Sequence, residues 1–255
     1  MADKRIKDLA TTATSPAGDD FIAIDGATNL TRKIAADSFL QEGDVVPSPT
    51  FVYDGTAGTT EFIVGDIPSS WQDSNSDLTQ LSIGISVTAI GGFAFRDCYG
   101  LTGSLTIPNS VTTIGTFAFS NTGHNGGLTI GTSVTSIGTY VFYGTGFTGS
   151  LTIPNSVTSI GSSAFYFCTS FTGNLTIGNS VTSIGTYAFA FCFGLNTAYL
   201  NQPIGQIENN AFSFSGITNV YIGPDATGYT LGAGQTIGGK SGITVAVWTN
   251  YPNVP

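Results

Sequence analysis

A repeat of 22 to 24 residues occupies more than half of this 255-residue chain. Each copy begins with Leu-Thr-Ile or a variant of it, continues with Val-Thr-x-Ile or a variant, and then has a small residue followed by Phe. The first motif stands at Leu81–Ile83, Leu105–Ile107, Leu128–Ile130, Leu151–Ile153, Leu175–Ile177, Ala198–Leu200 and Val220–Ile222. A repeat this short cannot bury its own apolar face, so its copies must stack. We therefore expect six coils over about residues 81–219 and a closing strand at 220–222.

Leu-Thr-Ile alternates apolar and polar side chains, which is the pattern of a strand with one buried face. Copies stacked about 4.8 Å apart form a parallel sheet, and Val-Thr-x-Ile forms a second short extended segment. The small residue and Phe predict a single helical or 3₁₀ turn that buries Phe as a ladder. The outward side chains of the first strand form one row: Ser82, Thr106, Thr129, Thr152, Thr176, Tyr199 and Tyr221.

The sequence of residues 151–171, LTIPNSVTSIGSSAFYFCTSF, closely resembles the BspA-like leucine-rich repeat, also called the Treponema pallidum type. The resemblance covers about residues 81–222 and implies a mainly β fold. That fold is a right-handed, curved solenoid with short strands and single helical turns, and the Leu-Thr-Ile strands lie on its concave side. The family is common in surface and adhesive proteins of bacteria and protists, and in viral proteins. A fold alone does not identify a partner.

Charged side chains make up only 9% of the chain, and residues 81–224 hold three of them: Arg96, Asp97 and Glu208. A net charge of −9 with seven basic residues cannot form a broad phosphate-binding surface, which excludes nucleic acid as a partner. No run approaches 18 apolar residues, so we expect no membrane insertion. The repeat region is expected to meet water through hydroxyls, amides and glycine.

Most of the basic residues lie in residues 1–46, and this segment resembles the N-terminal module of phage tail-fibre and head-fibre proteins. The resemblance implies anchoring to a virion, often as a trimer. It is carried by Lys4, Arg5, Ile6, Leu9, Phe21, Ile22, Ile24, Arg32, Lys33, Ile34 and Leu40. The alternative is a small β-hairpin that caps a neighbouring part. No apolar segment follows the basic N-terminus, so we expect no signal peptide.

Four regions are expected along the chain. Residues 1–46 form the anchoring and oligomerisation module, and residues 47–80 form a linker and an N-terminal cap with Trp71 and the 62–64 run over the first coil. Residues 81–222 are the leucine-rich repeats. Residues 223–255 form a C-terminal β-cap that carries Trp248 and Tyr251, because terminal repeats need a cover.

Nothing in the repeats predicts catalysis, a metal or a cofactor. Cys98, Cys168 and Cys192 share a repeat position with Thr122, Thr145 and Ser215, which indicates a small buried slot. His124 lies in a turn sequence, where we expect a solvated side chain. Asp97 and Glu208 lie nearly five coils apart, more than about 20 Å, and cannot form the carboxylate pair of a glycosidase. We expect a protein that is not an enzyme.

The first-strand row is the candidate recognition surface. Its hydroxyls and its two tyrosines suit weak contacts to a glycan or a protein. The candidate residues are Thr106, Thr129, Thr152, Thr176, Tyr199 and Tyr221. Threonine is also simply a good outward strand residue, and this alternative remains open.

These observations predict a phage virion protein, either a tail or head fibre or a decoration protein. Residues 1–46 contact other virion proteins as a homotrimer, and the repeats contact a host-surface glycan or protein. The alternative is a bacterial or protist cell-surface adhesin of the BspA-like family.

Overall fold

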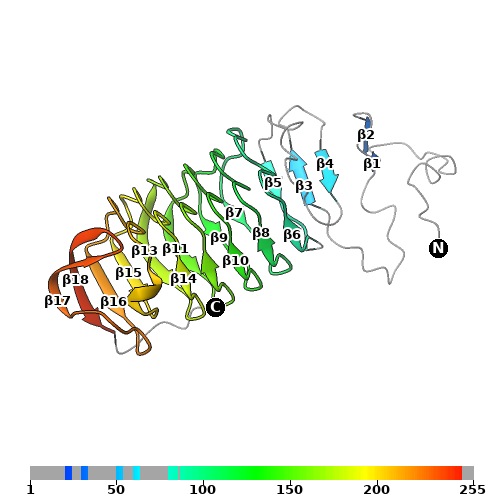
Figure 1. The fold of residues 1–255 in the computed structure, drawn as a ribbon. Helices are drawn as coiled ribbons and strands as arrows, with labels where there is room; N and C mark the ends of the chain where they lie inside the picture. The colour runs from blue at the N-terminus through cyan, green and yellow to red at the C-terminus, as the bar shows by residue number, and fades with distance from the viewer. Residues whose placement is uncertain are drawn as a thin grey trace.

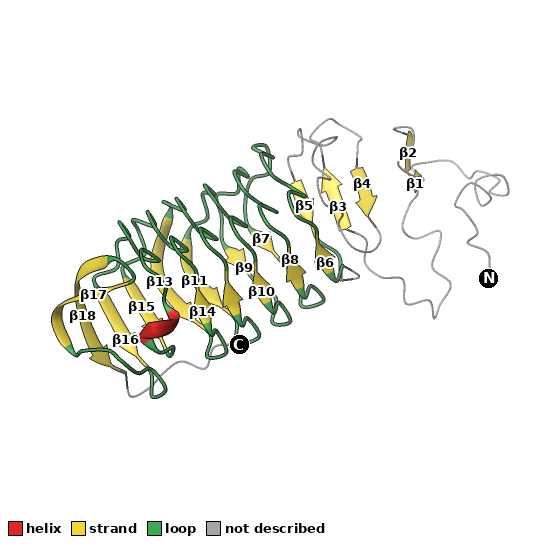
Figure 2. Cartoon of the chain, in the orientation of Figure 1, coloured by secondary structure: helices red, strands yellow, loops and turns green. Residues whose placement is uncertain are grey.

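The computed structural model describes residues 81–85 and 87–248, apart from the side chain of Ile204, and the backbone of five strand segments before residue 81. The described repeats form an elongated stack of coils, one behind another, as the colours from cyan to orange show in Figure 1. The fold is mainly β, as the repeat predicts. The described residues contain no α-helix, and their one helical segment is the 3₁₀ turn η4 (Ile204–Gln206), red in Figure 2.

The Leu-Thr-Ile motifs form one side of the coils. Those from the second coil onward pair in parallel, as β7-β9 and as β11-β13-β15-β16, and identical repeat positions stand in register, as with Leu151 on Leu175 and Ile153 on Ile177. Apolar side chains of the motif are buried and the central Thr faces outward in β7, β9 and β11. The strands are β5 (Gln80–Ser82), β7 (Leu105–Thr106), β9 (Leu128–Thr129), β11 (Gly149–Ile153), β13 (Phe171–Ile177), β15 (Thr197–Leu200) and β16 (Asn219–Ile222).

The Val-Thr-x-Ile motifs form a second parallel sheet of five two-residue strands, in the order β14-β12-β10-β8-β6. An isolated bridge from Ile184 to Ile207 extends it to the sixth coil. In each of these strands the Ile side chain is buried. Successive residues of a strand point to opposite sides, so a strand of two residues directs one side chain into the core. The strands are β6 (Ala89–Ile90), β8 (Thr113–Ile114), β10 (Ser136–Ile137), β12 (Ser159–Ile160) and β14 (Ser183–Ile184).

The small-Phe segment does not form the predicted helical turn. It alternates between two kinds of hydrogen bond. The N–H of Phe119 donates to Val141 O of the next coil at 2.9 Å, whereas the N–H of Ser120 donates back to Phe117 O at 3.1 Å. A helical turn would direct every N–H along its own coil and leave none for the neighbouring coil. The alternation places Phe117 and Asn121 at positive φ, 58° and 56°.

The core is a ladder of six phenylalanines, as predicted. Neighbouring rings stack with centroids 5.1 to 5.7 Å apart and all six are fully buried. The residues are Phe95, Phe119, Phe142, Phe165, Phe189 and Phe212. Each ring therefore contacts the same ring of the coils on either side, which ties the coils together along the axis.

Hairpins stand before and after the coils. At the C-terminal end, β18 (Lys240–Val247) pairs in parallel with β16, and β17 (Gly232–Ile237) pairs with β18 in antiparallel fashion. Ile237, Ile243 and Val245 are buried by this predicted β-cap. Trp248 is described, and Tyr251 lies outside the described residues.

Before the first coil, β3 (Thr50–Tyr53) pairs with β4 (Thr60–Ile63) and with β5, both antiparallel. The predicted packing of Trp71 and of the 62–64 side chains lies outside what the structure describes. Within the predicted anchoring segment, β1 (Phe21–Ile24) and β2 (Leu30–Lys33) form an antiparallel hairpin, with Phe21 opposite Lys33 and Ile22 opposite Arg32. The side chains of these strands, and the whole of Lys4, Arg5, Ile6, Leu9, Ile34 and Leu40, lie outside the described residues.

Candidate functional site

The predicted recognition row exists as a geometric feature of the first strands. Thr106 stands beside Thr129 in register, and the later part of the row runs through Thr152, Thr176, Tyr199 and Tyr221. Thr106, Thr129 and Thr152 are exposed, and their hydroxyls make no hydrogen bond to other described residues. These hydroxyls therefore face solvent.

The row ends in an aromatic cluster. Tyr199 stacks on Tyr221 with ring centroids 5.5 Å apart, and Trp248 of the cap lies 4.3 Å from the Tyr199 ring. The structure thus brings the two predicted tyrosines together and adds a tryptophan to them. All three side chains are half-buried, so much of their surface is used by the contacts among themselves.

The threonines beside the second sheet have a structural role. The hydroxyl of Thr135 donates to Thr112 O at 3.1 Å, and the same residue's N–H donates to that oxygen at 2.9 Å. Thr158 and Thr182 repeat this pair of bonds on the following coils. These threonine hydroxyls therefore donate their hydrogens to carbonyls of the preceding coil. The row of threonines beside the second sheet offers fewer hydrogen-bond donors to a ligand than its sequence indicates.

A second surface, which the sequence reasoning did not identify, lies on the side formed by the small-Phe turns. We call it the turn face and divide it into three rows by offset from the core Phe. The first row, two residues before it, is Phe93, Phe117, Tyr140, Ser163, Tyr187 and Asn210. The second row, one residue after it, is Arg96, Ser120, Tyr143, Tyr166, Ala190 and Ser213. The third row, two residues after it, is Asp97, Asn121, Gly144, Phe167, Phe191 and Phe214.

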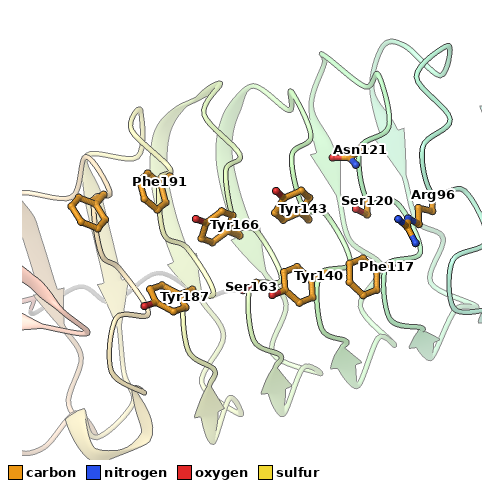
Figure 3. Close-up of a pocket in the computed structure, with 11 residues that line it drawn as sticks. Arg96, Phe117, Ser120, Asn121, Tyr140, Tyr143, Ser163, Tyr166, Tyr187 and Phe191 are labelled. Carbon is orange, nitrogen blue, oxygen red and sulfur yellow. The ribbon is translucent and has the colours of Figure 1, made fainter.

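Aromatic rings of the turn face stack along the solenoid axis. In the first row Phe117 and Tyr140 have centroids 4.6 Å apart at 5° between planes. In the second row Tyr143 and Tyr166 lie 5.5 Å apart at 8°. Figure 3 shows the two series side by side, with Phe191 continuing the upper one. They line a groove of about 610 Å³, which falls in the size range of ligand sites.

Several of these rings are exposed although their backbone is strained. Phe214 is 65% exposed, Phe167 49% and Tyr187 39%, and their φ angles are 57°, 62° and 60°. The left-handed region is costly for a bulky side chain, and a glycine or asparagine would relieve it. Gly144 and Asn210 occupy equivalent positions on other coils. Aromatic side chains are thus present where neither burial nor backbone geometry favours them.

The groove carries almost no net charge. Arg96 Nε lies 3.1 Å from Asp97 Oδ2, so the two opposite charges pair at the surface. Asn121 Nδ2 also donates to Asp97 Oδ1 at 2.8 Å, and the Arg96 guanidinium lies 5.5 Å from the Phe117 ring centroid. Both charges are therefore satisfied within the protein, and the remaining polar groups of the groove are hydroxyls and an amide.

The predicted cysteine slot is confirmed. All three cysteines are fully buried and no disulfide joins them. Cys168 Sγ donates to Phe142 O at 3.0 Å, and Thr145 Oγ1 donates to the same oxygen at 2.9 Å. Cysteine and threonine interchange here because each is small and can donate to a carbonyl of the core turn.

The prediction that His124 is a solvated loop residue is wrong. Its side chain is 1% exposed and its ring stacks on Phe147, with centroids 5.4 Å apart. Its Nδ1 lies 2.9 Å from Thr122 Oγ1. Burial lowers the pKa of His124 to about 4, so the ring is neutral at physiological pH.

Two other kinds of feature are absent from the described part of the chain. It contains no group of three or more His, Cys, Asp or Glu side chains placed to hold a metal ion. It also contains no helix long and apolar enough to cross a membrane. Asp97 is half-buried beside Arg96, and Glu208 is exposed on the sixth coil.

A sequence signal for the turn face does exist. Aromatic residues recur at fixed offsets around each small-Phe pair, and a core one ring wide cannot hold three aromatics per coil. Counting offsets from Phe165, for example, places Tyr166 and Phe167 beside a ring that already fills the core. Extra aromatics within two residues of the core Phe are therefore expected on the turn face, whereas Phe147 and Phe171, five and six residues after it, are buried.

Solved structures of other leucine-rich repeat proteins resemble this chain. One is a leucine-rich repeat protein from Eubacterium ventriosum ATCC 27560, with 14% identity, 69% of this chain and 73% of that chain covered, and a TM-score of 0.37. Another is the pneumococcal vaccine antigen PcpA, with 15% identity, 64% of this chain covered and a TM-score of 0.32; the match spans 51% of that chain. A third is a leucine-rich cell surface protein from Faecalibacterium prausnitzii A2-165, with 16% identity, coverages of 79% and 86%, and a TM-score of 0.25.

No curated protein matches the chain. The family model described as the BspA type leucine rich repeat region matches six copies, over residues 67–148 and 135–231. These ranges cover more than half of the chain and include every coil of the stack. The chain therefore belongs to the BspA-type leucine-rich repeat family.

Proposed function

We propose that this chain is a non-catalytic recognition protein of the adhesin type, which binds a partner surface through its turn face. The observation that carries the proposal is the set of exposed rings held in left-handed backbone, above all Phe167 and Phe214. Strained and solvent-exposed side chains are concentrated at functional sites in proteins. Exposed aromatic patches of this kind mark interaction surfaces.

The chemistry of the groove supports binding rather than catalysis. Its rings offer apolar faces and edges, and its Tyr, Ser and Asn side chains offer hydrogen bonds. The groove has no acid that could act as a general acid or base, since Asp97 is committed to Arg96 and Asn121. Similar weak contacts on successive coils add up over an extended ligand.

The membership of the BspA-type family supports a place on a cell surface, where such repeats serve as adhesive modules. The match to this family covers residues 67–231. The prediction of a virion fibre rests on residues 1–46, whose side chains lie outside the described residues. Attachment to other virion proteins, the homotrimer and the virion location therefore stay predictions, and the cell-surface adhesin is the better-supported function.

The test is saturable binding of the fluorescently labelled full chain to a panel of bacterial and epithelial cells, measured by flow cytometry with unlabelled protein as competitor. We expect saturable binding to at least one cell type. The variant Phe167→Ser/Phe214→Ser should lose at least about tenfold in affinity, because two exposed contact rings are removed. Tyr99→Ser is the matched control, since Tyr99 is 68% exposed and belongs to none of the three rows of the turn face. If the chain binds no cell type in the panel saturably, the proposal is wrong.

A further inference from the structure

The first row of the turn face has a gap. Phe93, Phe117 and Tyr140 stack in succession, with centroids 5.2 and 4.6 Å apart. The next coil carries Ser163 in place of a ring, and the coil after it carries Tyr187. No ring contact joins Tyr140 to Tyr187 in the described part of the chain. The two tyrosines therefore flank a slot with Ser163 at its base, as Figure 3 shows.

The slot has the width of one flat ring. Tyr140 and Tyr187 stand on coils two apart, so about 9.6 Å of axis separates their positions, twice the strand spacing of about 4.8 Å. Van der Waals contact on both faces of an inserted ring needs about 7 to 8 Å. One ring fits and two do not. Tyr143 and Tyr166 of the second row close the side of the slot. The ring centroids of Tyr166 and Tyr187 lie 6.2 Å apart, and those of Tyr143 and Tyr140 lie 5.6 Å apart.

The base of the slot holds a hydroxyl that has no partner in the described part of the chain. Ser163 is only 4% exposed and lines the groove, yet its side chain makes no hydrogen bond to other described residues. Ser120, two coils earlier, is 1% exposed and lines the same groove. The fully buried hydroxyls without a partner in the described residues are those of Ser110 and Ser215, so the Ser163 hydroxyl is reached from the open slot and can hydrogen-bond a polar ligand there.

The rim of the slot is polar and uncharged. Tyr140, Tyr143, Tyr166 and Tyr187 all line the groove and each brings a hydroxyl beside an apolar ring. Among the described residues, the charges at the groove are those of Arg96 and its neighbour Asp97, which pair with each other three coils away from Ser163. A ligand that matches this slot has two apolar ring faces, a rim of hydroxyls and no charge.

We infer that the slot binds one pyranose ring of an uncharged glycan, with further sugars of the chain running along the groove. A pyranose presents C–H groups on its faces to Tyr140 and Tyr187 and hydroxyls at its edge to Ser163. An aromatic side chain of a protein partner would fill the slot but would leave the Ser163 hydroxyl unpaired. The inference names the ligand class of the turn face and so rests on the proposed function.

The decisive variant is Ser163→Tyr, which supplies the missing ring. The equivalent positions already hold Tyr140 and Tyr187 at φ angles of 56° and 60°, and Ser163 has φ 55°, so the backbone accepts tyrosine here. The new ring should stack between its neighbours and keep or raise the unfolding temperature, while it occupies the slot. Loss of binding in a variant that is no less stable cannot be due to misfolding.

The matched control is Thr152→Tyr on the first-strand face. It makes a similar change in a row that already accepts tyrosine at Tyr199 and Tyr221. A second variant, Ser163→Ala, keeps the slot open and removes only its hydroxyl. It should weaken binding by about threefold to tenfold, the effect of one lost hydrogen bond.

The measurement is binding of the full chain to a printed array of neutral, sialylated and sulphated glycans, together with cell binding before and after periodate oxidation of the cell-surface glycans. We expect wild-type binding to neutral glycans, loss of more than about tenfold in Ser163→Tyr, retention in Thr152→Tyr, and loss of cell binding after periodate. Cell binding that resists periodate and is equal in Ser163→Tyr overturns the glycan inference and leaves the adhesin proposal intact. Binding to charged glycans alone also overturns it. Absence of any cell binding defeats the adhesin proposal itself.

Discussion

His124 occupies a core position of the repeat, where the other coils carry Leu101, Phe147, Phe171, Leu195 and Ile217. The hydroxyl of Thr122 donates its hydrogen to Phe119 O, so its oxygen accepts from the Nδ1–H of His124. Burial keeps the imidazole neutral at physiological pH, and the contact with Thr122 places its proton on Nδ1. In the aligned repeats this position is apolar in all the other coils, which identifies His124 as a core residue. The turn residues next to His124 do not indicate this by themselves.

This histidine makes stability depend on pH. The unfolded chain binds a proton at His124 near its ordinary pKa of 6.5, and the folded chain does so only near 4. The free energy of unfolding should therefore fall as pH drops from about 6.5 to 4, by up to about 3 kcal/mol, and level off below. His124→Phe matches Phe147 and Phe171 and should remove this component. Urea unfolding of wild type and variant across this pH range measures the His124 contribution as the difference between the two free energies of unfolding. If both free energies change with pH in parallel, His124 does not make this contribution.

The cysteines should be chemically silent in the folded protein. Burial, and to a smaller extent Asp97, raises the pKa of Cys98 to about 12, and burial raises the pKa of Cys192. A thiol reagent at pH 8 should label none of the three in the native state and all three after unfolding, because only the thiolate reacts. Rapid native labelling of any of them would show that the slot opens.

At the scale of one coil, glycine sets how closely the second strand approaches its neighbour. Gly161 N–H donates to Ile137 O at 2.8 Å, and a Cβ at Gly161 would lie 2.7 Å from the Gly138 carbonyl carbon. A Cβ at Gly138 would lie 3.1 Å from Ile114 O, and one at Gly205 would meet nothing within 4 Å. The glycine after the second strand thus differs in tolerance between Gly161 and Gly138, whereas Gly205, which stands at the Thr position of the sixth Val-Thr-x-Ile motif, has open space around it.

Three alanine variants test this gradient. Gly161→Ala should cost about 1 to 3 kcal/mol of unfolding free energy, because backbone atoms must move apart. Gly138→Ala should cost less, and Gly205→Ala should be neutral or stabilising by up to about 1 kcal/mol through reduced unfolded-state entropy. Denaturant unfolding measures all three. An equal effect at the three sites would show that coil spacing is not what the glycines control.

The strands were predictable from the sequence because each motif carries its own period-2 pattern, as at Leu151–Ile153. The turn after it was not, because the choice between a helical turn and alternating hydrogen bonds depends on the neighbouring coil. Phe119 N–H bonds to Val141 O, 22 residues away, and no local propensity of the sequence encodes that partner.

At the scale of the whole molecule, the C-terminal cap covers an open end of the stack of coils. Strand β16 would expose a row of unpaired N–H and C=O groups without β18, whose residues Thr244–Val247 pair with Asn219–Ile222. Deletion of residues 224–255 should therefore cause self-association through the uncovered edge. Sedimentation velocity at equal concentrations compares the truncated and full chains; equal sedimentation states would show that the cap does not protect the edge.

The candidate site was only partly predictable at this scale. Tyr199 and Tyr221 were identified from the sequence because they stand in a visible row, and the structure adds Trp248 to them. The turn face was missed because its groove needs the offsets of six coils to be superimposed before the gap at Ser163 becomes visible. The slot is a property of three successive coils and of no single motif.

Hydroxyl-radical footprinting shows which face of the molecule meets the partner. The full chain is oxidised by hydroxyl radicals, free in solution and bound to a cell type that it labels, and the modified side chains are mapped by mass spectrometry. The account predicts that binding protects Phe167, Tyr187 and Phe214, while Tyr199 and Tyr221 keep their reactivity. Protection of Tyr199 and Tyr221 with an unchanged turn face would contradict it.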